Sequence, residues 1–386
     1  MAIIGKCIKH RKIMTAIKNI KIRDFRNLIK VDCRFNSGYN LLIGENGQGK
    51  TNMLEAIYYL SLLRSFRTAS INELKNWDSK DKLFFISATT DENDGSRQLS
   101  VSYGQKRAVK INGMPLTRTS DYIGELVCIV FSPEDIEMIT GTGKVRRRFL
   151  DIALSQLSKR YLQALQAYKH ILKNRNNLLK QRTDNSKIIA SFDKQLIDYG
   201  VILHAERVQF FEKLKILIQQ KSERFYKGEK DFDIEFSSNT ALLQFESEEE
   251  LKETFMENLR NSMAKDLERG MSHCGPHRDD FVVRLQGKKL RSFGSRGQCR
   301  LASLLLRLCS SEIFLEGGRG EEVIFLVDDV TGELDDSVKN SFFTLLEKGT
   351  QVFFAATEIP EVLKNKNDIN IFSVNNGEIE QEKCDE

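Results

Sequence analysis

The stretch that decides the fold of this 386-residue chain is Gly44-Glu45-Asn46-Gly47-Gln48-Gly49-Lys50-Thr51. It matches the G-x-x-x-x-G-K-[ST] phosphate-loop pattern at every position. An apolar run precedes it at 39–43 and a helix-like segment follows at 52–57, so it has the strand–loop–helix context that the pattern requires. Glycines let a backbone curve around phosphates and point its N–H groups inward. The sequence therefore predicts a nucleoside triphosphate site.

The residues of this loop have different predicted roles. We expect all eight to bind the nucleotide, with Lys50 also acting in catalysis by reaching the β- and γ-phosphates. The Thr51 hydroxyl is expected to bind Mg²⁺, and the positive end of the following helix favours the anion. The alternative is a glycine-rich turn at a helix start that binds nothing.

A second predicted nucleotide element lies far along the chain. The apolar run Val323–Val327 is typical of a strand buried on both faces, and Asp328 and Asp329 follow it. We expect Asp328 to hold Mg²⁺ with Thr51, and Asp329 to orient or polarise the attacking water. The alternative is an acidic turn at a strand end. Because most of the chain separates the two elements, they predict one nucleotide-binding domain with a long insertion.

A third element begins with Ser295 and includes Gly297 and Gln298. A Ser-x-Gly-Gln turn at a helix N-terminus suits an anion. It resembles the signature motif of the ATP-binding-cassette (ABC) superfamily, in which one subunit's motif closes on a triphosphate held by another. These three residues are therefore predicted to contact a second subunit's nucleotide. Glu333-Leu334-Asp335 resembles the D-loop of the same superfamily.

The middle of the chain is predicted to be helical and basic. Apolar residues repeat every three or four positions from Leu154 to Leu172 and again from Phe192 to Leu217. This spacing predicts two antiparallel helices connected at 183–187. Lys and Arg exceed Asp and Glu by 12 between residues 144 and 228, although the whole chain carries only +5. This excess indicates a polyanion partner such as nucleic acid, or else a solvated helix surface. Candidate contacts are Arg146, Arg147, Lys159 and Arg160, although Arg146 to Arg148 equally suit bracing between lobes.

Composition excludes several other classes. No apolar run reaches the ~18 residues of a transmembrane helix. The seven cysteines have no paired spacing, which favours free thiols in a reducing compartment. A zinc site at His273, Cys274 and His277 would lack a second ligand cluster. The basic start lacks the features of a secretory signal, so it is either a disordered tail or lies upstream of a true start at Met14.

We predict an α/β fold divided into four segments. Residues 1–13 form an N-terminal extension, 14–143 the first half of an ATPase head, 144–270 a helical lobe, and 271–386 the second half of the head. Strands are expected at both ends of the chain, at 17–23, 31–35, 39–43, 83–88, 98–103, 108–111, 281–285 and 323–327. The strand at 108–111 is expected to end in a hairpin at Asn112-Gly113.

Several segments together resemble the RecF family of bacterial DNA replication and repair proteins, which are relatives of SMC-type ATPase heads. The resemblance runs from about Lys18 to the end of the chain. The segment Gly275-Pro276-His277-Arg278-Asp279-Asp280 is its most specific part. The other matching segments are Ile22–Leu28, Arg64–Thr68, Phe131–Asp135, Arg146–Asp151 and Val327–Asp335.

The resemblance implies a P-loop ATPase head of ABC/SMC type with an inserted helical lobe. It implies an ATP- and Mg²⁺-dependent homodimer that binds gapped duplex DNA and single-strand–duplex junctions. Hydrolysis is expected to be slow, DNA-stimulated and used as a switch. It further implies cooperation with RecR, RecO and RecA in recombinational repair, replication restart and the SOS response, in the bacterial cytoplasm at the nucleoid.

Four residues depart from the family pattern, namely Phe66, Cys299, Thr331 and Gly332. None of them removes a predicted phosphate or Mg²⁺ contact. Cys299 adjoins the signature motif, which suggests the hypothesis that its oxidation alters dimerisation. Two other classes stay open: an ATP-gated nuclease of the same lineage, which needs a further acidic cluster, and a transport subunit. The basic insertion and the lack of a Gln after Ile129–Phe131 disfavour the transport subunit.

Overall fold

A computed structural model gives the structure of most of the chain. It describes residues 16–92, 95–181, 186–225, 232–241, 243–316, 323–330, 332, 334–364, 366 and 368–382. The predicted extension at 1–13 lies outside the described residues, as do Thr331, Glu333 and most of the predicted connection at 183–187.

The chain divides into two compact units. The two-sheet unit comprises residues 1–134 and 314–386, and the helical unit comprises residues 135–313. The prediction placed these divisions at 143/144 and 270/271. The segment at 271–313 belongs with the helices because its strand β10 pairs with β9 of the helical unit and α7 packs on β10.

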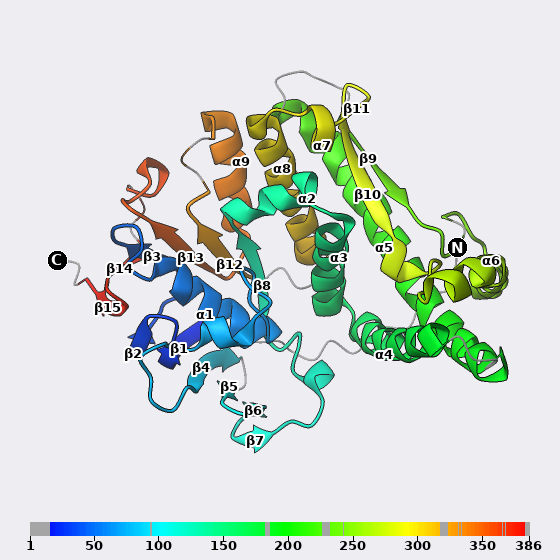
Figure 1. The fold of residues 1–386 in the computed structure, drawn as a ribbon. Coiled ribbons are helices and arrows are strands. Elements are labelled where there is room, and N and C mark those ends of the chain that lie inside the picture. The colour runs from blue at the N-terminus through cyan, green and yellow to red at the C-terminus, as the bar shows by residue number, and fades with distance from the viewer. Residues whose placement is uncertain are drawn as a thin grey trace. The chain divides into compact units, whose positions relative to one another are not determined.

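The first sheet of the two-sheet unit is antiparallel, in the order β2-β1-β4-β5-β6-β7 (Figure 1). Alternating buried and exposed positions, as in β1, are typical of strands with one face in a core. The predicted Asn112-Gly113 hairpin is present, with φ of 49° and 78°, and joins β6 to β7. The bounds are Ala16–Phe25 for β1, Leu28–Arg34 for β2, Phe84–Glu92 for β4, Gly95–Tyr103 for β5, Arg107–Ile111 for β6 and Met114–Pro115 for β7.

The second sheet has the order β15-β14-β3-β13-β12-β8 and is parallel except for β15. Its strands β8, β12 and β13 are buried at every position, as continuous apolar runs predict. The bounds are Gly38–Ile43 for β3, Val127–Phe131 for β8, Val323–Asp328 for β12, Gln351–Ala356 for β13, Ile369–Asn375 for β14 and Glu378–Gln381 for β15.

Helix α1 (Lys50–Leu62) forms the centre of this unit. It contacts β1, β4 and β5 of the first sheet and β8, β12 and β13 of the second. Residues from Met53 to Leu62 are all buried, so the helix is covered around its whole circumference, and its polar Glu55 and Ser61 are buried with the apolar side chains. Helix α9 (Asp336–Leu346) also belongs to this unit, and its Phe342 packs edge-on against Phe131 of β8.

The helical unit contains the inserted helices and a small antiparallel sheet in the order β11-β10-β9. The periodic run from Leu154 to Leu172 is divided between two helices, because Ser158 is extended and its hydroxyl accepts a hydrogen bond from the Tyr161 N–H. The strands are β9 (Phe232–Ser237), β10 (Asp280–Leu285) and β11 (Lys288–Lys289). The helices are α2 (Glu137–Thr140), α3 (Gly143–Leu157), α4 (Lys159–Gln181), α5 (Ser186–Phe225), α6 (Glu248–Arg269), α7 (Leu290–Phe293) and α8 (Arg296–Phe314).

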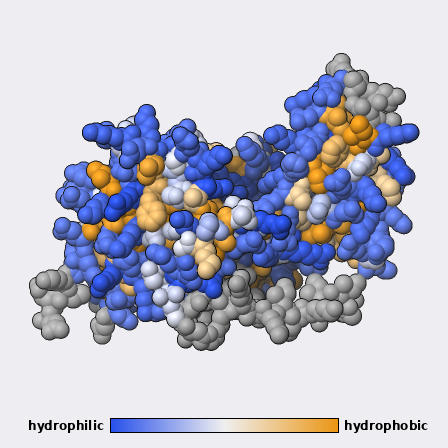
Figure 2. Space-filling model, turned by 90° about the horizontal axis from the view of Figure 1, so that it is seen from below, coloured by the Kyte–Doolittle hydropathy of each residue, from blue (hydrophilic) through white to orange (hydrophobic). Residues whose placement is uncertain are grey.

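Hydrophilic residues cover most of the molecular face drawn in Figure 2, and hydrophobic residues form separate patches on it. Among the helices that the structure describes, none combines the length and apolar character needed to cross a bilayer.

Candidate nucleotide-binding site

The phosphate loop has the predicted strand–loop–helix geometry. It connects β3 to α1, with positive φ at Gly47 (82°) and Gly49 (119°), values that favour glycine. Gly44 is required for another reason, because a Cβ built there would lie 2.3 Å from the Val374 carbonyl oxygen. The loop is thus shaped by backbone freedom at two positions and by a close approach to β14 at a third.

Lys50 folds back over the loop. Its ammonium donates hydrogen bonds to the carbonyl oxygens of Gly44 (2.6 Å) and Glu45 (2.8 Å). Burial lowers the pKa of this ammonium, while the nearby carboxylates of Asp329 and Asp328 act in the opposite direction. The cation is therefore held over the loop by bonds that an anionic ligand can replace.

Thr51 and Asp328 meet, as predicted. The Thr51 hydroxyl donates a 2.8 Å hydrogen bond to Oδ1 of Asp328. Strand β13 lies between β3 and β12, and its Ala355 is in register with both Leu42 and Asp328. The carboxyl ends of these parallel strands therefore share one edge of the sheet, which is where α/β folds bind ligands.

The electrostatic surroundings of the Asp328 carboxylate favour the binding of a cation. The Asp328 side chain is buried, and its pKa is raised from 3.8 to about 6, mainly by this burial. The negative charges of Glu134 and Asp329 contribute to the rise, whereas Thr51 and Arg67 oppose it. A divalent cation here would relieve this concentration of carboxylates, so these residues fit a Mg²⁺ site.

Asp329 and Glu134 are two exposed acids at the same sheet edge. Asp329 has a left-handed backbone, with φ of 47°, and its N–H donates to the Ala355 carbonyl at 3.2 Å. Glu134 follows β8, the neighbour of β12. Our sequence reasoning missed Glu134, although its place just after a buried strand was the available signal.

The hairpin between β1 and β2 also contacts the phosphate loop and helix α1. Arg26 forms a bidentate ion pair with the fully buried Glu55 of α1, at 2.9 and 3.0 Å. Asn27 donates to the Gln48 carbonyl at 3.1 Å and accepts from Asn52 at 2.8 Å. These contacts tie the hairpin to the loop, and no role is predicted from the sequence for Arg26, Asn27, Asn52 or Glu55.

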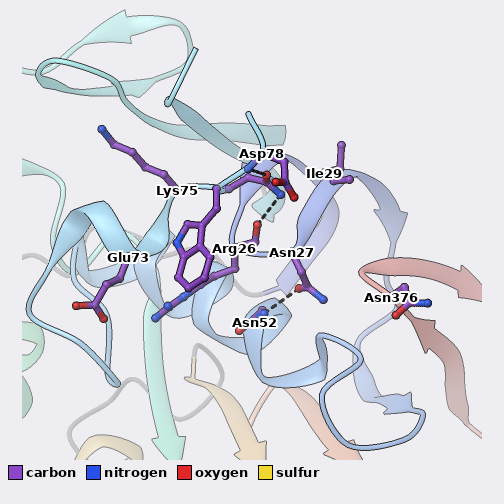
Figure 3. Close-up of a pocket in the computed structure, with 10 residues that line it drawn as sticks. Arg26, Asn27, Ile29, Asn52, Glu73, Lys75, Asp78 and Asn376 are labelled. Carbon is purple, nitrogen blue, oxygen red and sulfur yellow. Dashed lines mark hydrogen bonds between the residues drawn. The ribbon is translucent and has the colours of Figure 1, made fainter. Parts of the chain in front are cut away.

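A pocket opens beside this hairpin (Figure 3). Its lining includes Arg26, Asn27, Asn52, Lys75 and Trp77, and it has room for a ligand of roughly 400 Å³. Trp77, the single tryptophan of the chain, is 81% exposed. Since Asn27 and Asn52 belong both to the pocket and to the loop's hydrogen-bond network, the pocket adjoins the phosphate loop. The remaining lining residues are Ile29, Glu73, Asn76, Asp78 and Asn376.

The predicted signature turn lies in the helical unit, at the start of α8. The Ser295 hydroxyl accepts from the Gln298 N–H at 3.2 Å, and the Gln298 side-chain oxygen accepts from the Ser295 N–H at 2.9 Å. This reciprocal arrangement is a capping box. All of Ser295, Gly297 and Gln298 are accessible to solvent, and a Cβ on Gly297 would meet no atom within 4 Å.

Comparisons with known proteins agree with this architecture. A family model described as "RecF/RecN/SMC N terminal domain" matches residues 16–380. The DNA replication and repair protein RecF of Clostridium novyi (strain NT) is 34% identical over 366 residues, which cover 95% of this chain and 99% of that protein. Its namesake from Streptococcus equi subsp. zooepidemicus (strain MGCS10565) is 35% identical, with 94% and 97% covered. The chain belongs to the RecF family.

Solved structures extend the likeness to three dimensions. The structure of the recombination mediator protein RecF–ATP in the RecFOR pathway matches with a TM-score of 0.86 and 30% identity, covering 97% of this chain and all of that one. The Smc head domain from Pyrococcus furiosus matches with a TM-score of 0.54 at 15% identity, which shows a similar fold and nothing more. The predicted ABC/SMC-type ATPase head is thereby confirmed.

The RecF-family segment from Gly275 to Asp280 is anchored by buried arginines. Arg207 of α5 donates to the Pro276 carbonyl at 2.6 Å and to the Asp279 carboxylate at 2.7 Å. Arg146 of α3 forms a bidentate pair with Asp280 at 2.6 and 2.9 Å. Arg146 is 5% exposed, which disfavours a DNA contact, and it braces elements within the helical unit, whereas the prediction had it bracing the two lobes. Arg147 also donates to this segment, at the Asp279 carbonyl.

The cysteine and histidine positions singled out earlier have ordinary hydrogen-bond partners. Cys299 is 2% exposed, its thiol lies 3.6 Å from the Leu290 carbonyl, and burial raises its pKa. Because the thiolate is the reactive form, this environment disfavours the hypothesis that Cys299 senses oxidation. His273 contacts Asp266, His277 contacts Tyr168, and the Cys274 thiol donates to the Asn239 carbonyl.

Proposed function

We propose that this chain is an ATP-dependent DNA-binding protein of recombinational repair and replication restart. In this proposal ATP drives dimerisation, and the dimer clamps gapped duplex DNA or single-strand–duplex junctions. The observation that carries it is the Thr51–Asp328 hydrogen bond at the phosphate loop, because it joins the two halves of a triphosphate site across the chain. Membership of the RecF family and the likeness to a RecF–ATP structure support it.

The geometry of the loop supports the proposed roles of its residues. The N–H groups of Gly44 to Lys50 and the N-terminus of α1 bind the phosphates, and Lys50 exchanges its two carbonyl partners for phosphate oxygens. Thr51 and Asp328 hold Mg²⁺, which when bound neutralises phosphate charge. Asp329 orients the attacking water. An Asp329→Asn variant should bind ATP and dimerise but hydrolyse poorly, so brisk turnover would remove Asp329 from this role.

The pocket beside Trp77 suits the nucleobase. The indole offers an exposed aromatic face, and amide groups of Asn27 and Asn52 lie between the pocket and the loop. Stacking on Trp77 would place the base at one end of the nucleotide while the loop binds the other.

The dimer uses the signature turn of a second subunit. Ser295, Gly297 and Gln298 present a hydroxyl and helix N–H groups to solvent, where a γ-phosphate from another chain can reach them. Hydrolysis removes that γ-phosphate and opens the dimer, so the weak, DNA-stimulated ATPase works as a switch. The proposal includes loading of RecA with RecR and RecO at the bacterial chromosome, and a solved RecF structure described as part of the RecFOR pathway supports it.

Analytical ultracentrifugation tests the proposal directly. We expect a monomer without nucleotide, a dimer with ATP and Mg²⁺, and a heavier complex when a gapped duplex is added, with weaker binding to plain single strands. A protein that stays monomeric under saturating ATP and Mg²⁺, with and without the gapped duplex, contradicts it. Metal-dependent cleavage of the gapped duplex by the pure protein would instead favour the nuclease alternative.

A further inference from the structure

Helix α4 (Lys159–Gln181) has an unusual charge composition. Its 23 residues include six Lys or Arg and no Asp or Glu. Helix α6, of 22 residues in the same unit, has seven acidic and four basic residues and an i,i+4 pair between Glu248 and Lys252. Exposed helices ordinarily mix both signs in this way, because opposite charges one turn apart stabilise them and like charges do not. Helix α4 has no acidic residue and therefore forms no such pair within its own sequence.

Seven exposed residues of α4 form one continuous row, and Arg160, Lys169 and Gln181 are exposed as well. The seven recur at intervals of three and four positions, which places them on a single helix face. The opposite face, including Tyr161, Leu165 and Tyr168, is buried, and α4 packs on α5 (Figure 1). We call this row the α4 stripe; it consists of Lys159, Gln163, Gln166, His170, Lys173, Asn177 and Lys180.

The remaining cations of α4 are held by acids from other elements. Arg175 is fully buried between Asp193 and Asp266. Lys169 pairs with Asp151 at 3.0 Å, and Arg160 lies 3.6 Å from Glu248. Three of the six cations thus pair with acids of other elements. The other three lie on the stripe, and Lys159 among them also has an interaction within the chain.

We propose that the α4 stripe contacts the sugar–phosphate backbone of a nucleic acid duplex. Its lysines supply positive charge and its Gln and Asn amides supply donors, with no carboxylate on the helix to repel phosphates. A helix of 23 residues is about 35 Å long, close to the ~34 Å of one duplex turn. This inference rests on the proposed function and assigns a surface to it.

The side chains of the stripe favour nucleic acid over an acidic protein. Protein interfaces have a core enriched in aromatic and other apolar residues, whereas nucleic-acid interfaces are more polar and positively charged. The stripe contains no apolar residue along its length. Backbone contacts of this kind carry no base specificity, so the stripe should bind duplexes of any sequence.

The test compares two double variants that remove equal charge. Lys173→Gln/Lys180→Gln alters the stripe, and Lys213→Gln/Lys265→Gln removes two exposed lysines from α5 and α6. Fluorescence anisotropy with a labelled gapped duplex, in ATP and Mg²⁺, is measured over a series of KCl concentrations. Each lost phosphate contact should reduce the slope of log K against log salt by about 0.9, so the stripe variant should lose nearly 2 and bind at least about tenfold more weakly at 0.1 M salt.

The outcomes separate the inference from the proposed function. The α5/α6 variant should match the parent in slope, and both variants should bind ATP and melt like the parent. A stripe variant with the parent's affinity and slope overturns the inference while the proposed DNA clamp survives. No DNA binding by the parent overturns both. Equal binding of the parent to poly-L-glutamate at matched charge would reject nucleic acid as the occupant of the stripe.

Discussion

The Thr51 hydroxyl donates a 2.8 Å hydrogen bond to the Asp328 carboxylate, although 277 positions separate the two residues in sequence. One residue begins the helix after the phosphate loop and the other ends a buried strand. The candidate nucleotide site therefore needs both sequence segments of the two-sheet unit to be folded together, because each segment alone supplies only one of these two residues.

The pKa of Asp328 predicts a pH-dependent stability. Because its folded pKa of about 6 lies above the ordinary 3.8, its favourable contribution is complete below about pH 4 and is lost as the pH rises through 6. The shift corresponds to about 3 kcal/mol at most. We expect Asp328→Asn to lose much less stability than the parent between pH 5 and 7.5. Urea unfolding without Mg²⁺ or nucleotide measures this, and identical pH profiles would contradict it.

Lys50 and Ser295 should separate binding from dimerisation. Lys50→Met removes the loop cation and should abolish ATP binding and the dimer together. Ser295→Arg places a bulky cation on an exposed turn, so it should bind ATP as a monomer and fail to dimerise. Isothermal titration and sedimentation measure the two properties. If Ser295→Arg dimerised normally in ATP, the signature turn would lose its assigned role.

Trp77 offers a direct optical readout. As the chain's single tryptophan it accounts for all indole emission, and at 81% exposure that emission should be typical of a solvated indole. Stacking of adenine should quench it when ATP binds, and inorganic triphosphate should not. Trp77→Ala should weaken ATP binding by roughly 1–2 kcal/mol, close to tenfold, with an unchanged melting temperature. Equal quenching by triphosphate would place the base elsewhere.

Arg207 should be essential to the stability of the helical unit. It donates to Asp151 at 2.8 Å and Asp279 at 2.7 Å, and all three side chains are buried. Arg207→Met leaves two buried carboxylates without this partner, which costs about 3–5 kcal/mol. Lys213→Met, on the exposed face of the same helix, is the matched control and should change the unfolding free energy by less than about 0.5 kcal/mol. Similar values for the two variants would contradict this view of the network.

Two glycines should respond differently to the same added methyl group. Gly44→Ala forces a Cβ to within 2.3 Å of a backbone oxygen of β14, so we expect a loss of about 1–3 kcal/mol in stability. Gly297→Ala meets open space and should fold like the parent. Thermal unfolding compares them. A Gly44→Ala protein as stable as the parent would show that the loop can move away from Val374.

The sequence was most informative where chemistry depends on neighbours in the chain. The phosphate loop, the buried β12 strand and the capping box at Ser295 each have a local pattern with a specific physical reason. Alternation and continuous apolar runs likewise placed most strands of the two sheets. The meeting of Thr51 with Asp328 was predicted because the chemistry of Mg²⁺–triphosphate binding requires both.

Contacts between distant side chains were not predictable in this way. No sequence pattern near Arg26 indicates that it pairs with Glu55. Likewise, no pattern in helix α5 distinguishes Arg207 from the other basic residues of that helix. The break at Ser158 was missed because the apolar spacing continues across it, whereas a side-chain cap decided the local structure. Arg146 was a candidate DNA contact from its charge alone, and burial beside Asp280 gives it a structural partner instead.

The position of β3 in its sheet has a consequence for biosynthesis. Both neighbours of β3, β13 and β14, are made after residue 350, so the strand leaves the ribosome long before either partner exists. At typical elongation rates it spends tens of seconds with two unpaired edges. Nascent copies are therefore vulnerable to aggregation throughout that interval, and a prematurely terminated copy lacking β13 could not assemble the site that ATP is proposed to occupy.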